Sequence, residues 1–167
     1  MATLRISIQK RADGGAVLRC TRADGSVTWQ KQEGPRAAFF PRHDLTHFTV
    51  EQVLGLRRGF YGLIAEGWDI PDTEGKGPRG PLPDEALAVE HLVGLLDLER
   101  AGVADWTADA VNREAAEWAA RAGRHAGRPV SDDDLARVRS CMRELFSRWA
   151  GVPPGETLEL RFDTAGT

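Results

Sequence analysis

Residues 4–29 read LRISIQKRADGGAVLRCTRADGSVTW, and this pattern indicates which class of fold to expect. Apolar and polar residues alternate in three short runs, which is the period of strands that bury one face. The pairs Asp13-Gly14 and Asp24-Gly25 separate the runs. Asp-Gly turns join antiparallel neighbours, because both residues tolerate the positive φ angles of tight turns. The stretch therefore predicts a three-stranded antiparallel meander.

The middle of the chain has the spacing of amphipathic helices. Apolar residues recur there every three to four positions, between glycines and prolines that end helices. Four segments have this pattern: one from a start between 41 and 49 to about 66, then 84–100, 107–122 and 131–150. Ser131 and the three aspartates after it predict an N-cap for the last helix.

A final alternating run, residues 158–162, predicts a C-terminal strand. We expect it to pair with the N-terminal meander, because an isolated strand would leave its backbone groups unpaired. The expected fold class is α+β: a small antiparallel sheet, made of the three-strand meander and the C-terminal strand, packed against about four helices. We expect a single domain over residues 1–167.

Two glycine-containing features also suggest local structure. The stretch from about 68 to 84 contains four prolines and three glycines, which predicts a long surface loop. Such a loop is either a cover over a functional site or a disordered excursion. Gly55, Gly59 and Gly62 fall on one arc of the first expected helix. Since glycine lowers helix stability unless it allows a close approach, this arc predicts a tight contact with another element.

Composition limits the function classes. The 167 residues are 41% apolar and 28% charged, with a net charge of −3. This mildly acidic balance argues against a dedicated nucleic-acid binder, although a local basic face is compatible with it. No apolar run is long enough for a transmembrane helix, and the start lacks a signal-peptide pattern. Cys20 and Cys141 are too few for a disulfide framework, so we expect reduced thiols in a cytoplasmic protein. Together, these observations predict neither membrane nor nucleic-acid partners.

One motif suggests chemistry. His43, His47 and Glu51 are spaced i, i+4, i+8, which forms a stripe along a helix that already includes His43. Two imidazoles one turn apart can bind one metal ion, and a carboxylate can complete or orient the set. The string His43-Asp44-x-x-His47 resembles the His-Glu-x-x-His signature of zinc peptidases, with an aspartate that is one methylene shorter.

A third histidine adds to this set. His91 falls on the inward, leucine-rich face of the helix at 84–100. A buried imidazole needs a partner for its nitrogens, and a metal shared with His43 and His47 would provide one. The predicted metal ligands are therefore His43, His47 and His91. Asp44 and Glu51 are the predicted catalytic residues, with Asp44 as a general base or an imidazole-orienting group.

A structural interpretation competes with this one. Residues Thr49-Val50-Glu51-Gln52 form a capping box that would start the helix at Thr49 and leave His43 and His47 in a loop. His91 could then simply bond to a backbone carbonyl or a neighbouring acid. The first hypothesis is a metal-binding domain, extending to a metal-dependent hydrolase with zinc or a similar divalent ion and a small-molecule substrate. The alternative is a non-catalytic interaction or oligomerisation module, forming a homo-oligomer, with structural histidines.

Overall fold

The computed structural model describes residues 3–164 and has an α+β fold, as the sequence predicts. Its antiparallel sheet has the strand order β3-β2-β1-β4. The strands are β1 (Thr3–Lys10), β2 (Ala16–Thr21), β3 (Val27–Gln32) and β4 (Thr157–Asp163). In the register, Ile6 of β1 lies opposite Cys20 of β2 and Leu160 of β4. The predicted meander and its pairing with the C-terminal strand are confirmed.

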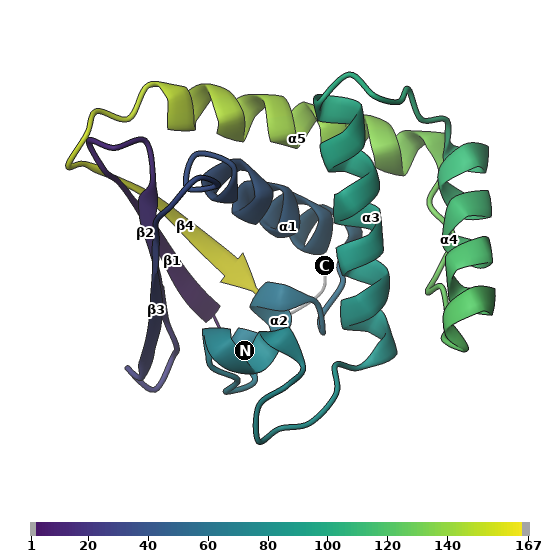
Figure 1. Cartoon of the computed structure of the whole chain (residues 1–167), viewed down its shortest axis with the longest axis horizontal. Coiled ribbons are helices and arrows are strands. Elements are labelled where there is room, and N and C mark those ends of the chain that lie inside the picture. The colour runs from purple at the N-terminus through teal and green to yellow at the C-terminus, as the bar shows by residue number, and fades with distance from the viewer. Residues whose placement is uncertain (1–2, 165–167) are drawn as a thin grey trace.

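The helices lie on one side of this sheet (Figure 1). They are α1 (Phe40–Leu54), α2 (Phe60–Ala65), a short 3-10 helix η1 (Ile70–Glu74), α3 (Asp84–Arg100), α4 (Ala108–Ala122) and α5 (Asp132–Ala150). The predicted N-cap of α5 is confirmed, because the Ser131 hydroxyl accepts from the Asp134 N–H, and the Asp134 side chain accepts from the Ser131 N–H.

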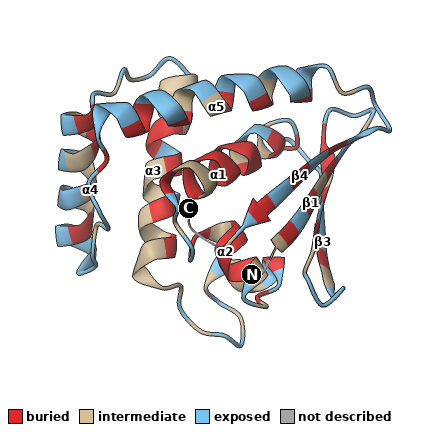
Figure 2. Ribbon diagram, turned by 180° about the vertical axis from the view of Figure 1, so that it is seen from behind, coloured by how far each residue is buried: buried red, intermediate tan, exposed pale blue. Residues whose placement is uncertain are grey.

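The apolar core has two main parts, separated by α1. One part fills the space between the inner face of the sheet and α1, α2 and α5, and the other joins α1 to α3, α4 and α5. Helix α1 is accordingly buried along most of its length (Figure 2). Because α1 packs on both sides, its polar side chains must find partners inside the protein.

The first predicted helix is wrong in one respect, since it is interrupted. Helix α1 ends at Leu54, Gly55 takes a left-handed conformation with φ 65°, and α2 begins only after Gly59. The three glycines therefore do not share one helix face, but two of them do allow close approaches: an added Cβ would meet the Glu51 side chain at Gly59 and the Arg57 carbonyl at Gly62. The start is settled as well: α1 begins at Phe40, so the capping-box start at Thr49 is not used. His43 and His47 lie inside the helix.

The Gly/Pro-rich stretch is more ordered than the predicted loop. It contains η1, whose Ile70 is buried and donates its backbone N–H to Thr28 Oγ1 of β3. Trp68 and Leu82, which flank η1, pack with Leu63 of α2 and Ala86 of α3. The segment is therefore packed against α2, α3 and β3. Within residues 3–164, no helix is both long and apolar enough to cross a bilayer.

Candidate metal centre

His43 and His47 lie one turn apart on α1, as the stripe predicts. Their ring centroids are 4.8 Å apart, with an interplanar angle of 77°. The Phe39 ring stacks on His43, and the Phe60 ring lies against His47. His47 is almost completely buried, whereas the side chain of His43 keeps 23% of its exposure. These aromatic contacts thus restrict the side-chain orientations of both imidazoles.

Helix α3 brings two carboxylates to these rings. His47 Nε2 lies 3.0 Å from Glu90 Oε1, and His43 Nδ1 lies 2.7 Å from Asp97 Oδ2. The earlier histidine meets the later acid, so α1 and α3 run in opposite directions. Glu90 and Asp97 are seven residues apart, which places both on the same face of α3. Neither residue was predicted from the sequence. Two acidic residues seven positions apart on one helix, together with two histidines at i, i+4 on another, could have indicated them.

Glu51 provides a third carboxylate, behind His47. Its Oε1 lies 3.4 Å from His47 Nδ1, and its Oε2 accepts from the backbone N–H groups of Tyr61 and Gly62 at 3.0 and 3.1 Å. Its side chain is fully buried. The carboxylate therefore orients His47 and holds the start of α2. This placement favours a positioning role over the predicted catalytic one.

The resulting cluster brings three possible metal-ligating side chains together. One donor atom each from His43, His47 and Glu90 lie within 4.8 Å of one another. Asp97 occupies Nδ1 of His43, which leaves Nε2 for an ion, while Glu51 lies at Nδ1 of His47 and leaves its Nε2. Histidines that bind metals usually donate their other nitrogen to a carboxylate or carbonyl, which sets the tautomer and the ring orientation. His43 Nδ1 has such a carboxylate in Asp97, at 2.7 Å, whereas His47 Nδ1 forms no hydrogen bond and lies 3.4 Å from Glu51 Oε1.

Charges in the cluster are strongly coupled. Burial alone lowers the pKa of His47, but the adjacent carboxylates of Glu51 and Glu90 raise it to about 10. Burial opposes ionisation of Glu90 as well, yet the hydrogen bond to His47 lowers the Glu90 pKa below its usual value. Without a metal, His47 is therefore an imidazolium between carboxylates. A metal ion would have to displace its proton, since only a neutral imidazole coordinates.

His91 does not lie beside His43 and His47, which corrects the predicted ligand set. It stacks on Trp118 of α4, with ring centroids 5.1 Å apart and an interplanar angle of 14°. The reason is helical geometry: successive residues differ by about 100° around the axis, so Glu90 faces α1 while His91 faces α4. His91 was expected to face the helix that carries His43 and His47, but it faces α4 instead. Glu90 takes the place of the third ligand.

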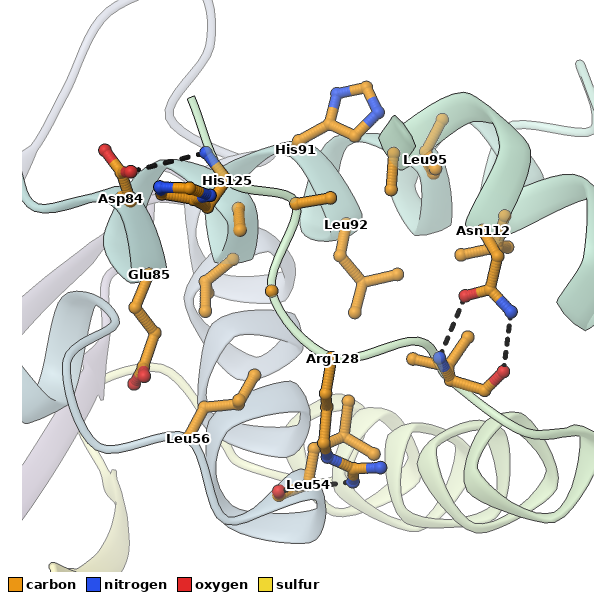
Figure 3. Close-up of a pocket in the computed structure, with 17 residues that line it drawn as sticks. Leu54, Leu56, Asp84, Glu85, His91, Leu92, Leu95, Asn112, His125 and Arg128 are labelled. Carbon is orange, nitrogen blue, oxygen red and sulfur yellow. Dashed lines mark hydrogen bonds between the residues drawn. The ribbon is translucent and has the colours of Figure 1, made fainter. Parts of the chain in front are cut away.

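His91 instead lines a separate cavity of about 380 Å³ between α3, α4 and residues 123–130. Figure 3 shows Leu92 and Leu95 beside it, with Arg128 below them and Asn112 at one end. The amide of Asn112 is fully engaged, because it both donates to and accepts from the backbone of Val130 at 2.8 Å. The cavity is a mainly apolar space between helices, distinct from the histidine cluster.

Asp44 points to the sheet, away from the cluster. Its carboxylate is buried and accepts a hydrogen bond from Gln32 Nε2 of β3, and its backbone carbonyl accepts from the Tyr61 hydroxyl at 3.2 Å. The prediction that Asp44 orients an imidazole or acts as a base is therefore not supported by its placement. The next position on a helix is rotated by about 100°, so a side chain adjacent to His43 faces another layer.

Asp44 is expected to make stability depend on pH. Burial raises its pKa from 3.8 to about 6, although the hydrogen bond from Gln32 opposes the shift. The folded state then binds more protons than the unfolded state between about pH 4 and 6, so the free energy of unfolding falls as pH rises through this window. The loss is on the order of 3 kcal/mol, at 1.36 kcal/mol per pKa unit. Asp44→Asn should remove this slope in urea unfolding at pH 4 to 8. An unchanged slope would contradict the assignment.

Comparison with known proteins adds no family to this geometry. The chain matches no protein-family model, no curated protein and no solved structure. The geometry of the site is therefore the basis for its function.

Proposed function

We propose that the chain binds a divalent transition metal, such as zinc, through His43, His47 and Glu90. One observation carries this proposal: two imidazoles and a carboxylate converge, and each imidazole has a second carboxylate at its other nitrogen. Zinc favours nitrogen and oxygen donors of this kind. The donors come from two helices that pack through the core, so the set is held together by the fold.

The proposal extends to metal-dependent hydrolysis of a small molecule. Two histidines and a glutamate are a ligand set that catalytic zinc sites use, and three protein ligands leave a further coordination position open. A bound cation would polarise a carbonyl or phosphoryl oxygen and lower the pKa of water. The Glu90 side chain is 46% exposed, so a substrate can approach the cluster from solvent at this residue. His47 and Glu51 stay buried behind it.

Metal titration of the chelator-treated protein tests the proposal. We expect Zn²⁺ or Co²⁺ to bind with 1:1 stoichiometry in calorimetry, with Co²⁺ giving the visible absorption of a low-symmetry site. His43→Ala and Glu90→Gln should each weaken binding by at least about 100-fold, because even supporting residues contribute 10- to 100-fold. Asp97→Asn should weaken it by about 10-fold. These three residues are partly exposed, so the variants should fold.

His125→Ala is the matched control, since this histidine is exposed and distant in sequence from the cluster. Its metal affinity should equal that of the unmodified chain. Binding that is absent at micromolar metal, or equally weakened by the control, would refute the site. Hydrolysis is checked separately with chromogenic esters and phosphoesters. Turnover should require metal and disappear with His43→Ala.

A non-catalytic interaction module remains the second candidate, favoured by the charge state of His47. Its imidazolium is already balanced by Glu51 and Glu90, so the network can serve as a structural ion pair between α1, α2 and α3. Under this function, the melting temperature is the same with chelator and with metal. Light scattering should then show a homo-oligomer or a partner complex.

A further inference from the structure

Within residues 3–164, no helix covers the outer face of the sheet. All helices pack on the opposite face, where residues such as Leu4, Ile6 and Leu18 are fully buried (Figures 1 and 2). The outward positions alternate with these and are largely exposed. This face is therefore a largely polar surface in contact with solvent.

Three arginines gather on this face, one from each of three adjacent strands. Arg5 of β1 lies directly opposite Arg161 of β4, and Arg19 of β2 lies opposite Ser7, one pair further along β1. Directly opposite side chains in an antiparallel pair are about 5 Å apart, and diagonal ones about 7–8 Å. The three side chains and Ser7 line one shallow hollow in the sheet surface.

The hollow keeps a net positive charge, because three arginines line it with one carboxylate, that of Glu159. Within residues 3–164, none of the three guanidinium groups forms an ion pair or a hydrogen bond with another side chain. Glu159 also lines the hollow, but its carboxylate accepts from the Ser7 hydroxyl at 2.6 Å. Like charges placed directly opposite destabilise a sheet. The Arg5–Arg161 pair therefore has a cost that an anionic ligand would remove.

An aromatic side chain adjoins the cluster. Trp29 of β3 lies opposite Arg19 on the same face, and it is 60% exposed. The exposed indole offers a large, rigid apolar surface with a polar N–H at its edge. A flat ring beside a group of arginines can stack on a nucleobase while the arginines contact phosphates.

We infer that this face binds single-stranded nucleic acid, with phosphates at Arg5, Arg19 and Arg161 and one base stacked on Trp29. Stacking on a flat sheet requires bases that are not paired, which favours single strands over duplexes. The net charge of −3 does not oppose this, because only two acidic residues of the four described strands, Glu159 and Asp163 of β4, lie on this face, and both accept hydrogen bonds from hydroxyl groups of β1. The site is independent of the proposed metal centre on the other side of the sheet.

Fluorescence anisotropy with labelled single-stranded DNA and RNA oligonucleotides, titrated with the full chain, tests this inference. Affinity should fall as salt rises, because binding releases counterions. Arg19→Ala combined with Arg161→Ala should reduce the slope of log K against log salt by about 1.4, at about 0.7 per lost contact to a single strand. Trp29→Ala should weaken binding by about 5- to 100-fold and leave this slope unchanged, since stacking is not ionic.

The matched control combines Arg113→Ala and Arg143→Ala, which remove two exposed arginines from α4 and α5. It should bind like the unmodified chain. The inference is overturned if the oligonucleotides fail to bind at micromolar protein in about 50 mM salt. It is also overturned if the control loses as much affinity as the sheet variant. Binding to anionic lipid vesicles without binding to oligonucleotides would also overturn it.

Discussion

Replacing Glu51 with alanine is expected to lower the free energy of unfolding by about 3–5 kcal/mol, which is the range for breaking a buried ion pair. The carboxylate is completely buried, and it is shared by His47 and the backbone N–H groups of Tyr61 and Gly62. Alanine would leave two N–H groups without acceptors and would remove one of the two carboxylates that balance the His47 imidazolium. Each of these changes costs free energy in a buried site.

Urea unfolding followed by circular dichroism measures this loss. Glu51→Gln keeps an oxygen that can accept one N–H but loses the charge, so its effect should be smaller than that of Glu51→Ala. Glu144→Ala is the control, because Glu144 is an exposed carboxylate on α5, and its effect should stay within about 0.5 kcal/mol. A loss below about 1 kcal/mol for Glu51→Ala would show that the carboxylate does not hold α2.

Replacing Gly62 with alanine is expected to cost about 3 kcal/mol, at the upper end for overpacking. An added Cβ at this position would lie 1.8 Å from the carbonyl oxygen of Arg57. Relief would require a movement of the chain between α1 and α2. That movement is resisted on both sides, since Glu51 holds the Gly62 N–H and Glu85 Oε1 accepts from the N–H groups of Arg57 and Arg58.

Gly94→Ala provides the matched control for this substitution. Gly94 lies on the exposed side of α3, and an added Cβ there would meet nothing within 4 Å. Alanine favours the helix over glycine, so Gly94→Ala should raise the free energy of unfolding by about 0.5–1 kcal/mol. Thermal and urea unfolding of both variants would show opposite signs. If Gly62→Ala were as stable as the unmodified chain, the close approach of the Arg57 carbonyl would be disproved.

Much of the fold could be predicted because its signals are local. Alternation over residues 4–29 and the two Asp-Gly turns are sufficient for the meander, since strand period and turn conformation depend on neighbouring residues. The capping box at Ser131 likewise marks the start of α5 within four residues. The interruption after Leu54 was missed, although its signal is local: Gly55 is a left-handed C-cap, and the Leu56 N–H bonds to the Glu51 carbonyl. Glu85 of α3 holds the turn that follows, which no local pattern indicates.

The candidate site was predicted only in part, for the same reason. The pairing of His43 with His47 follows from spacing on one helix and was found. Glu90 and Asp97 belong to α3, and their approach depends on how two helices pack. His91 and Asp44 were assigned to the cluster from sequence proximity or inward direction, yet a rotation of about 100° per residue directs them to α4 and to the sheet.

The sequence by itself determined the order and type of the main elements and the presence of two histidines on one helical face, since these follow from periodicity and capping over a few residues. The tertiary structure alone decided which carboxylates meet those histidines, which layer each neighbouring side chain faces, and that three arginines from separate strands share one bare face of the sheet. Such contacts join residues far apart in the chain, and helix packing and strand register bring them together only in the folded protein.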